Sequence, residues 1–120
     1  MKVENRYFRI TNNFLHDMST GTWFACALVT WLLAGRVSGV PTEAAAALAE
    51  AMRLLFWLAA AALAVITATG GVRLAYWRRE ASPDELAQKR RALLVKHAVF
   101  LVVYGAGTVW LWTLVSGASA

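Results

Sequence analysis

The sequence from residue 92 to residue 115, ALLVKHAVFLVVYGAGTVWLWTLV, carries a single formal charge, on Lys96. A helix of about 20 residues spans the hydrocarbon core of a bilayer, which is about 30 Å thick. Two further stretches, 14–34 and 54–74, are also long and apolar enough to span it. The 120-residue chain is 59% hydrophobic and only 16% charged, which is too apolar for a soluble domain of this size. We therefore predict an all-α integral membrane protein, with residues 1–120 forming a single domain of three transmembrane helices.

The basic residues predict the orientation of this bundle. The segment 75–91, between the second and third predicted helices, is rich in arginine and lysine, whereas the segment between the first and second has only Arg36 and Arg53, balanced by Glu43 and Glu50. The positive-inside rule then places the basic segment and the N-terminus in the cytoplasm and the C-terminus outside, as expected for a multi-pass protein of the cell inner membrane. Topology and anionic lipids account for the net charge of +5, so nucleic acid is not a predicted partner.

Three short motifs predict where the helices begin. The cluster Thr11-Asn12-Asn13 consists of good N-cap residues and precedes the first apolar run. In Ser82-Pro83-Asp84-Glu85, the serine is an N-cap, the proline occupies the first helical position, and the glutamate completes a capping box. Pro41-Thr42-Glu43 opens an alanine-rich stretch that predicts an external extension of the second helix. The first apolar run is of spanning length without a convincing cleavage site, so we expect it to remain in the mature protein.

The two histidines of the chain, His16 and His97, are the main functional candidates. Ionisable side chains inside a membrane segment are costly to bury and so suggest a function. At 1.5 Å per residue, both lie within about 5 to 8 Å of the predicted cytoplasmic boundary. One imidazole on each of two helices, at the same level, is the arrangement needed for axial ligation of a b-type haem. We therefore predict that His16 and His97 are iron ligands.

Small and polar residues near these histidines predict room for a macrocycle. Ser19, Thr20 and Trp23 share the face of His16, and Leu101, Tyr104 and Thr108 share that of His97, because residues three, four or seven apart lie on one side of a helix. The antiparallel second helix brings Thr67, Thr69, Gly70 and Gly71 to the same level. Ordinary close packing of membrane helices is the alternative explanation for these small residues. The predicted cofactor-binding residues are, besides the two histidines, Ser19, Thr20, Gly70, Arg73, Arg91, Lys96, Leu101 and Tyr104.

Charged residues at the predicted cytoplasmic rim have two expected roles. Haem propionates are anionic, and Arg73, Arg91 and Lys96 are the cations expected to pair with them. Asp17 is costly to bury, so we expect its carboxylate to reach the surface and meet Lys96 or Arg91. The alternative is that Asp17 orients a histidine.

Other metal chemistry fits the sequence less well. A zinc site needs three or four ligands, but Cys26 lies ten residues from His16, which is about 15 Å along a helix. A copper site formed by the two histidines and Met18 is conceivable because thioethers suit copper(I). Met18, however, projects from a different face of the helix than His16.

Two short motifs resemble a known group of membrane proteins. Phe14-Leu15-His16-Asp17-Met18, followed by Trp23, resembles the opening helix of the CopD-like copper-resistance proteins and the HemJ-like protoporphyrinogen oxidases. Leu94-Val95-Lys96-His97-Ala98 resembles the start of a later helix in the same groups. The resemblance covers about a third of the chain and implies a small helical membrane protein that holds b-type haem. Those proteins commonly have four or more spans, so the three predicted here put an independent oxidase or copper-transport activity in doubt.

These features favour a haem-b membrane subunit that carries electrons within a respiratory or quinone-linked redox complex, an electron-transfer subunit rather than an independent enzyme. No catalytic residue is predicted. A quinone or a redox protein is the expected exchange partner, and three helices are a thin scaffold for haem, so we expect a homo-oligomer or incorporation with other membrane subunits. The main alternative is a cofactor-free accessory subunit that stabilises a larger membrane complex, its histidines hydrogen-bonded to neighbours. Porphyrin oxidation and copper transport are further alternatives.

Overall fold

The computed structural model describes residues 2–80 and 82–119, with side chains described for 6–79, 82–85 and 89–118. These residues form three long α-helices and one short 3-10 helix, without strands, as the sequence predicts. Each long helix is long and apolar enough to cross a membrane. The chain therefore has the architecture of a multi-pass membrane protein. In chain order the elements are α1 (Lys2–Ala34), η1 (Val37–Gly39), α2 (Thr42–Glu80) and α3 (Pro83–Ser119).

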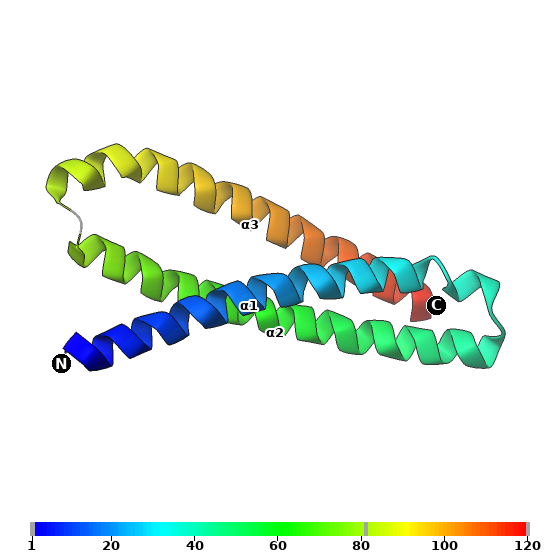
Figure 1. Cartoon of the computed structure of the whole chain (residues 1–120). Helices are drawn as coiled ribbons and strands as arrows, with labels where there is room; N and C mark the ends of the chain where they lie inside the picture. The colour runs from blue at the N-terminus through cyan, green and yellow to red at the C-terminus, as the bar shows by residue number, and fades with distance from the viewer. Residues whose placement is uncertain (1, 81, 120) are drawn as a thin grey trace.

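The helices form an elongated antiparallel bundle with two different ends (Figure 1). The N-terminus and the turn from α2 to α3 lie at one end, and the C-terminus and the connection from α1 to α2 lie at the other. The first end carries most of the arginines and lysines, and we call it the basic end. Toward this end α3 diverges from α2, whereas the three helices lie close together at the opposite end (Figure 1).

The buried core lies mainly in the half of the bundle away from the basic end. Thr30, Met52 and Leu111, one from each helix, are almost completely inaccessible. The inward face of α2 repeats an apolar residue every three or four positions, which is the spacing of one helical stripe. Large apolar side chains also cover the outer surfaces of all three helices, as lipid contact requires. The core cluster consists of Trp23, Cys26, Met52, Phe56, Ala59, Ala62, Ile66, Tyr104, Leu111 and Val115.

Trp23 connects α1 to α3. Its indole Nε1 donates a hydrogen bond to Thr108 Oγ1 at 3.3 Å, and its ring packs edge-to-face on Tyr104 with 4.8 Å between the ring centroids. The ring lies directly against Gly107, where an added Cβ would be only 2.6 Å from Trp23 Cη2. Gly107 therefore leaves the space that the buried indole occupies.

The structure confirms two of the predicted helix starts and corrects the third. The Glu85 backbone N–H donates to Ser82 Oγ at 3.3 Å, so the serine caps α3, which begins at Pro83. The helix α2 begins at Thr42, as its motif predicts. The predicted start of the first helix at Thr11-Asn12-Asn13 is wrong, because α1 runs through these residues from Lys2. Asn12 is instead buried, and its Nδ2 donates to the Thr69 carbonyl of α2 at 3.0 Å, a tertiary contact that the local capping preference does not reveal.

Replacing Gly107 with alanine should destabilise the bundle. The added methyl group would overlap the Trp23 ring, and overpacking of this kind costs about 1–3 kcal/mol. Gly105→Ala is the matched control, because a Cβ at Gly105 meets nothing within 4 Å. We expect the free energy of unfolding, measured by titration with SDS in detergent micelles, to fall for Gly107→Ala and not for Gly105→Ala. Equal stability of the two variants would contradict the packing described for Trp23.

Candidate functional site

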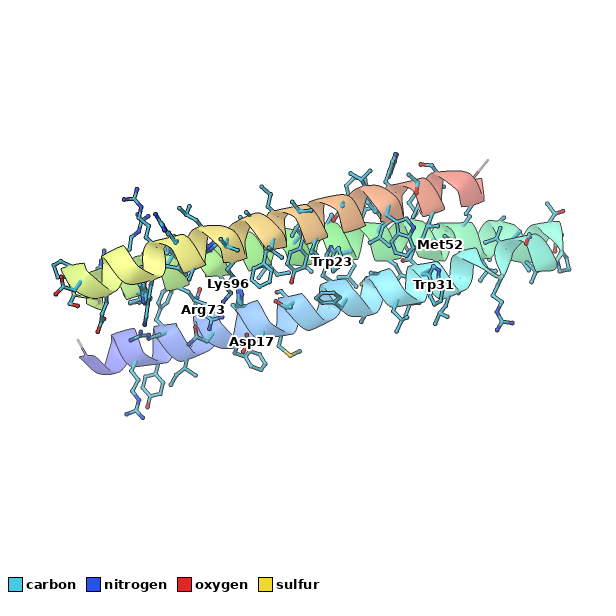
Figure 2. All side chains as sticks on the ribbon, turned by 90° about the horizontal axis from the view of Figure 1, so that it is seen from above. Asp17, Trp23, Trp31, Met52, Arg73 and Lys96 are labelled. Atoms are coloured by element: carbon cyan, nitrogen blue, oxygen red, sulfur yellow. The ribbon has the colours of Figure 1, made fainter. Side chains whose placement is uncertain are left out.

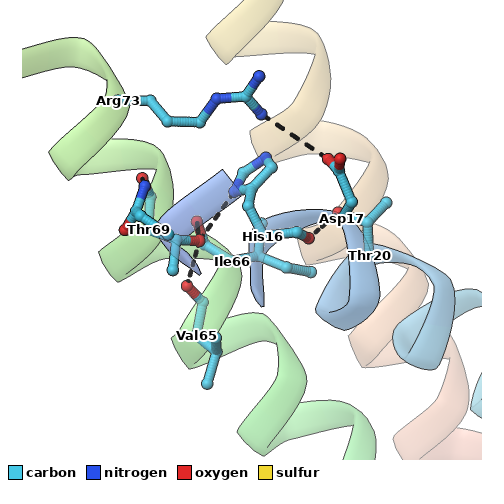
Figure 3. Close-up of polar contacts among 8 residues, drawn as sticks. His16, Asp17, Thr20, Val65, Ile66, Thr69 and Arg73 are labelled. Carbon is cyan, nitrogen blue, oxygen red and sulfur yellow. Dashed lines mark hydrogen bonds and ion pairs between the residues drawn. The ribbon is translucent and has the colours of Figure 1, made fainter. Parts of the chain in front are cut away.

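His16 lies between α1 and α2 with its ring half-buried. Its Nδ1 is 2.8 Å from Thr69 Oγ1, and the same hydroxyl donates to the Val65 carbonyl at 2.7 Å (Figure 3). A hydroxyl has one hydrogen, and a carbonyl oxygen can only accept a hydrogen bond. The Thr69 hydroxyl therefore donates its hydrogen to the Val65 carbonyl oxygen. The His16 Nδ1–H must therefore donate to Thr69 Oγ1. In the neutral ring the lone pair is then on Nε2, the nitrogen left available for a ligand.

The surroundings of His16 fix the position of its ring. The ring lies against Gly70, where an added Cβ would be 3.4 Å from His16 Cε1. Asn12, one turn earlier on α1, holds the Thr69 backbone, and Thr20 Oγ1 donates to the His16 carbonyl at 2.9 Å. The sequence-based prediction that Thr69 and Gly70 reach the level of His16 is thus confirmed. The site depends on close packing of α1 on α2.

An ion pair lies beside this histidine. Arg73 Nη1 is 3.8 Å from Asp17 Oδ1, and it joins α2 to α1 (Figures 2 and 3). Asp17 therefore pairs with Arg73 and not with Lys96 or Arg91 as expected, because Arg73 is one turn beyond Thr69 on the face of α2 that packs on α1. The pair is solvent-exposed and so is worth at most about 1 kcal/mol.

Lys96 of α3 also belongs to this end of the bundle. Figure 2 shows it at the same level of the bundle as Arg73 and Asp17. Its Nζ lies 5.6 Å from the centroid of the Phe100 ring, a cation–π contact. All three helices therefore contribute polar or charged groups at the level of His16.

His97 lies on the exposed part of α3 that diverges from α2. Its Nδ1 is 2.6 Å from the Leu93 carbonyl oxygen one turn earlier. Because that oxygen can only accept, Nδ1–H is the donor, and the neutral ring again has its lone pair on Nε2. Both histidines of the chain thus share one tautomer, with Nδ1–H anchored and Nε2 available.

A cleft of about 510 Å³ opens between α2 and α3 next to His97. This volume is within the range of ligand sites in proteins, about 300–1,000 Å³. Three leucines and a tryptophan form apolar walls, and each helix contributes one arginine. The cleft was not predicted, because the divergence of α3 leaves no signature in the local sequence. Its lining residues are Leu74, Trp77 and Arg78 of α2, and Arg90, Leu93, Leu94 and His97 of α3.

The two histidines lie beside successive turns of α2, His16 at residues 69–70 and His97 at residues 74–78. His16 contacts Thr69 and Gly70, and His97 lines the cleft together with Leu74. Gly70 and Leu74 are four residues apart and so lie on the same face of α2. His16 and Gly70 themselves are not among the residues that line the cleft.

The remaining predicted site residues have different environments. Tyr104 is only 8% exposed and packs against the rings of Trp23, Phe24 and Phe100, seven residues beyond His97 on α3. Leu101 is 76% exposed on the outer surface of α3. Ser19 and Thr20 are half-buried, while Arg91 is exposed and does not line the cleft.

Within the part of the chain that the structure describes, no three side chains of His, Cys, Asp or Glu are grouped to hold a metal ion. Comparisons with models of protein families, with curated proteins and with solved structures find no match. The functional inference therefore depends on the geometry of the two histidines and the cleft.

Thr69→Val should change the tautomer of His16. Valine has nearly the shape of threonine without the hydroxyl, so the His16 Nδ1–H loses its acceptor, at a cost of about 1 kcal/mol in stability. Thr67→Val is the matched control, because the exposed Thr67 hydroxyl bonds only to the Leu63 carbonyl of its own helix. We expect ¹⁵N NMR of labelled histidine to show protonated Nδ1 and unprotonated Nε2 at His16 in the wild type and in Thr67→Val, and a mixture in Thr69→Val. An Nε2-protonated ring in the wild type would refute the assignment.

Proposed function

We propose that the chain is a membrane-embedded b-type haem subunit that carries electrons within a respiratory or quinone-linked redox complex, with His16 and His97 as iron ligands. The observation that supports this proposal is that both imidazoles have Nδ1–H anchored to an oxygen and Nε2 available, beside successive turns of α2. Haem iron binds neutral imidazole through its lone pair, and ligating histidines characteristically donate their other N–H to an oxygen.

The residues around His97 fit a porphyrin. The cleft has apolar walls for a macrocycle, an imidazole in its lining and cations for anionic substituents. Bound haem would supply a one-electron iron couple. The Thr69 hydroxyl and the Leu93 carbonyl would hold the two imidazoles in the ligating tautomer and increase the basicity of Nε2. Leu74, Leu93 and Leu94 would keep water from the site, a property that tunes redox potential.

A partner is part of this proposal. His97 and the surface of α3 around Leu101 and Val102 are exposed in the isolated chain. A homo-oligomer or other membrane subunits would cover this surface, and a quinone or redox protein would exchange electrons there. A cofactor-free accessory subunit is the second candidate, because the His16–Thr69 hydrogen bond has a structural role of its own in joining α1 to α2.

The proposed orientation puts the basic end in the cytoplasm and the C-terminus outside, in the cell inner membrane. The concentration of arginine and lysine at this end supports it through the positive-inside rule. Both histidines would then lie near the cytoplasmic leaflet.

The haem proposal predicts a visible spectrum that depends on both histidines. We expect full-length protein, produced with an adequate haem supply and purified in detergent, to show Soret and alpha bands in a reduced-minus-oxidised spectrum. His16→Ala and His97→Ala should each abolish the wild-type spectrum, and added imidazole should restore ligation. Thr67→Val, which changes an exposed residue outside the site, is the control. A colourless wild-type protein with normal helicity would favour the accessory subunit.

Cysteine labelling tests the orientation. In a Cys26→Ser background, Ser38→Cys places a thiol between α1 and α2, and Asp84→Cys places one at the basic end. Both positions are exposed, and neither change removes a basic residue or the Ser82 cap. We expect a membrane-impermeant maleimide to label intact spheroplasts at position 38 and to label position 84 only after the membrane is permeabilised. The reverse pattern would place the basic end outside.

A further inference from the structure

Arg78 and Arg90 face the cleft from two different helices. Both are exposed, and neither forms an ion pair with a carboxylate whose side chain the structure describes. Of the three cations expected from the sequence to bind an anionic cofactor, Arg73 is paired with Asp17, Lys96 lies over the Phe100 ring, and Arg91 does not line the cleft. The cations available at the cleft are therefore Arg78 and Arg90.

The rest of the cleft complements an apolar, planar molecule. Leu74, Leu93 and Leu94 give it aliphatic walls, and Trp77 adds an aromatic one. His97 lies in the same lining, within one turn of Leu93 and Leu94. A ligand that matches these walls has an apolar body, and two anionic groups would match the two arginines.

We propose that Arg78 and Arg90 bind the two propionate carboxylates of a porphyrin whose macrocycle occupies the cleft between α2 and α3. This inference rests on the proposed function and names the residues that select its cofactor. Guanidinium groups pair with carboxylates through charge-assisted hydrogen bonds, which are stronger than neutral ones. An anionic phospholipid shares the charge and the apolar body, but it has no group for the imidazole and no planar ring for Trp77. The porphyrin uses every chemical feature of the lining.

Metal-free protoporphyrin IX tests the arginines separately from iron ligation. Its binding to the full-length protein in phosphatidylcholine nanodiscs can be followed by porphyrin fluorescence. We expect the free acid to bind at least about tenfold more tightly than the dimethyl ester, because the ester has no carboxylate for the arginines. Equal binding of the acid and the ester would overturn the proposal.

The double variant Arg78→Gln/Arg90→Gln should lose this preference, with about tenfold weaker binding of the acid and unchanged binding of the ester. Arg79→Gln/Lys89→Gln is the matched control, since it removes the same charge from adjacent exposed positions that do not line the cleft. We expect the control to bind the acid as the wild type does. An equal loss in both double variants would mean that only the general positive charge matters, and the proposal would be wrong. Circular dichroism checks that all variants keep their helicity.

Nanodiscs that also contain phosphatidylglycerol distinguish a lipid occupant. If this lipid weakens binding of the porphyrin acid to the wild type and not to Arg78→Gln/Arg90→Gln, a lipid phosphate occupies the arginine pair, and the proposal fails. Binding that is unchanged by the lipid supports the porphyrin.

The same probe separates this inference from the haem proposal. Metal-free porphyrin cannot be ligated by histidine, so His16→Ala and His97→Ala should change its affinity by no more than about twofold. A protein that binds metal-free porphyrin through the arginines but shows no histidine-dependent haem spectrum would refute the electron-transfer role and leave the arginine site standing. A histidine-dependent haem spectrum, together with porphyrin binding that does not depend on Arg78 and Arg90, would support the electron-transfer role and refute the arginine site.

Discussion

The single proton of the Thr69 hydroxyl determines the chemistry of the candidate site. Because that proton is donated to the Val65 carbonyl, the hydroxyl can only accept from His16, so Nδ1 carries the hydrogen and the neutral ring has its lone pair on Nε2. Asn12 holds the Thr69 carbonyl from the previous turn of α1, and Gly70 allows the imidazole to approach the α2 backbone. A polar group inside an apolar bundle is costly without such partners. Each of these contacts therefore supports both the packing of α1 on α2 and the state of the imidazole.

The cleft follows from how α3 is attached. Trp23 fixes α3 to α1 by filling the space at Gly107 and bonding to Thr108, in the part of the bundle where core residues are most deeply buried. Nothing comparable fastens the first turns of α3, whose described side chains are mostly exposed. The helix is thus held along its later half and diverges from α2 at the basic end (Figure 1). The tight packing around Trp23 and the cleft at the basic end therefore both result from the attachment of α3 along its later half.

The sequence predicted the features that depend on composition or on neighbouring residues. Hydropathy gave the three helices, the Ser82 motif gave the start of α3, and antiparallel geometry placed Gly70 beside His16. The features that the sequence predicted wrongly or did not predict are contacts between helices. Asn12 has the local character of a cap but is used in a tertiary hydrogen bond, and Asp17 pairs with the helix that packs closest to it. The rotation and divergence of packed helices depend on side chains distant in the sequence, so the cleft and its arginines were not visible in any local pattern.

The exposure of His97 bears on how a haem at this site would work. Its backbone hydrogen bond to Leu93 lies within α3 and so fixes the tautomer without help from another helix, whereas His16 depends on α2 for the same purpose. Movement of α3 relative to α2 would therefore carry His97 along with its tautomer intact and would leave the His16–Thr69 hydrogen bond between α1 and α2 in place. Under the proposed function, a large planar cofactor would enter where α3 diverges from α2 (Figure 1), and α3 would then pack against it. Under the proposed function, binding of the cofactor would supply the contacts that the first half of α3 lacks, and the haem would stabilise the fold as well as carry the electron.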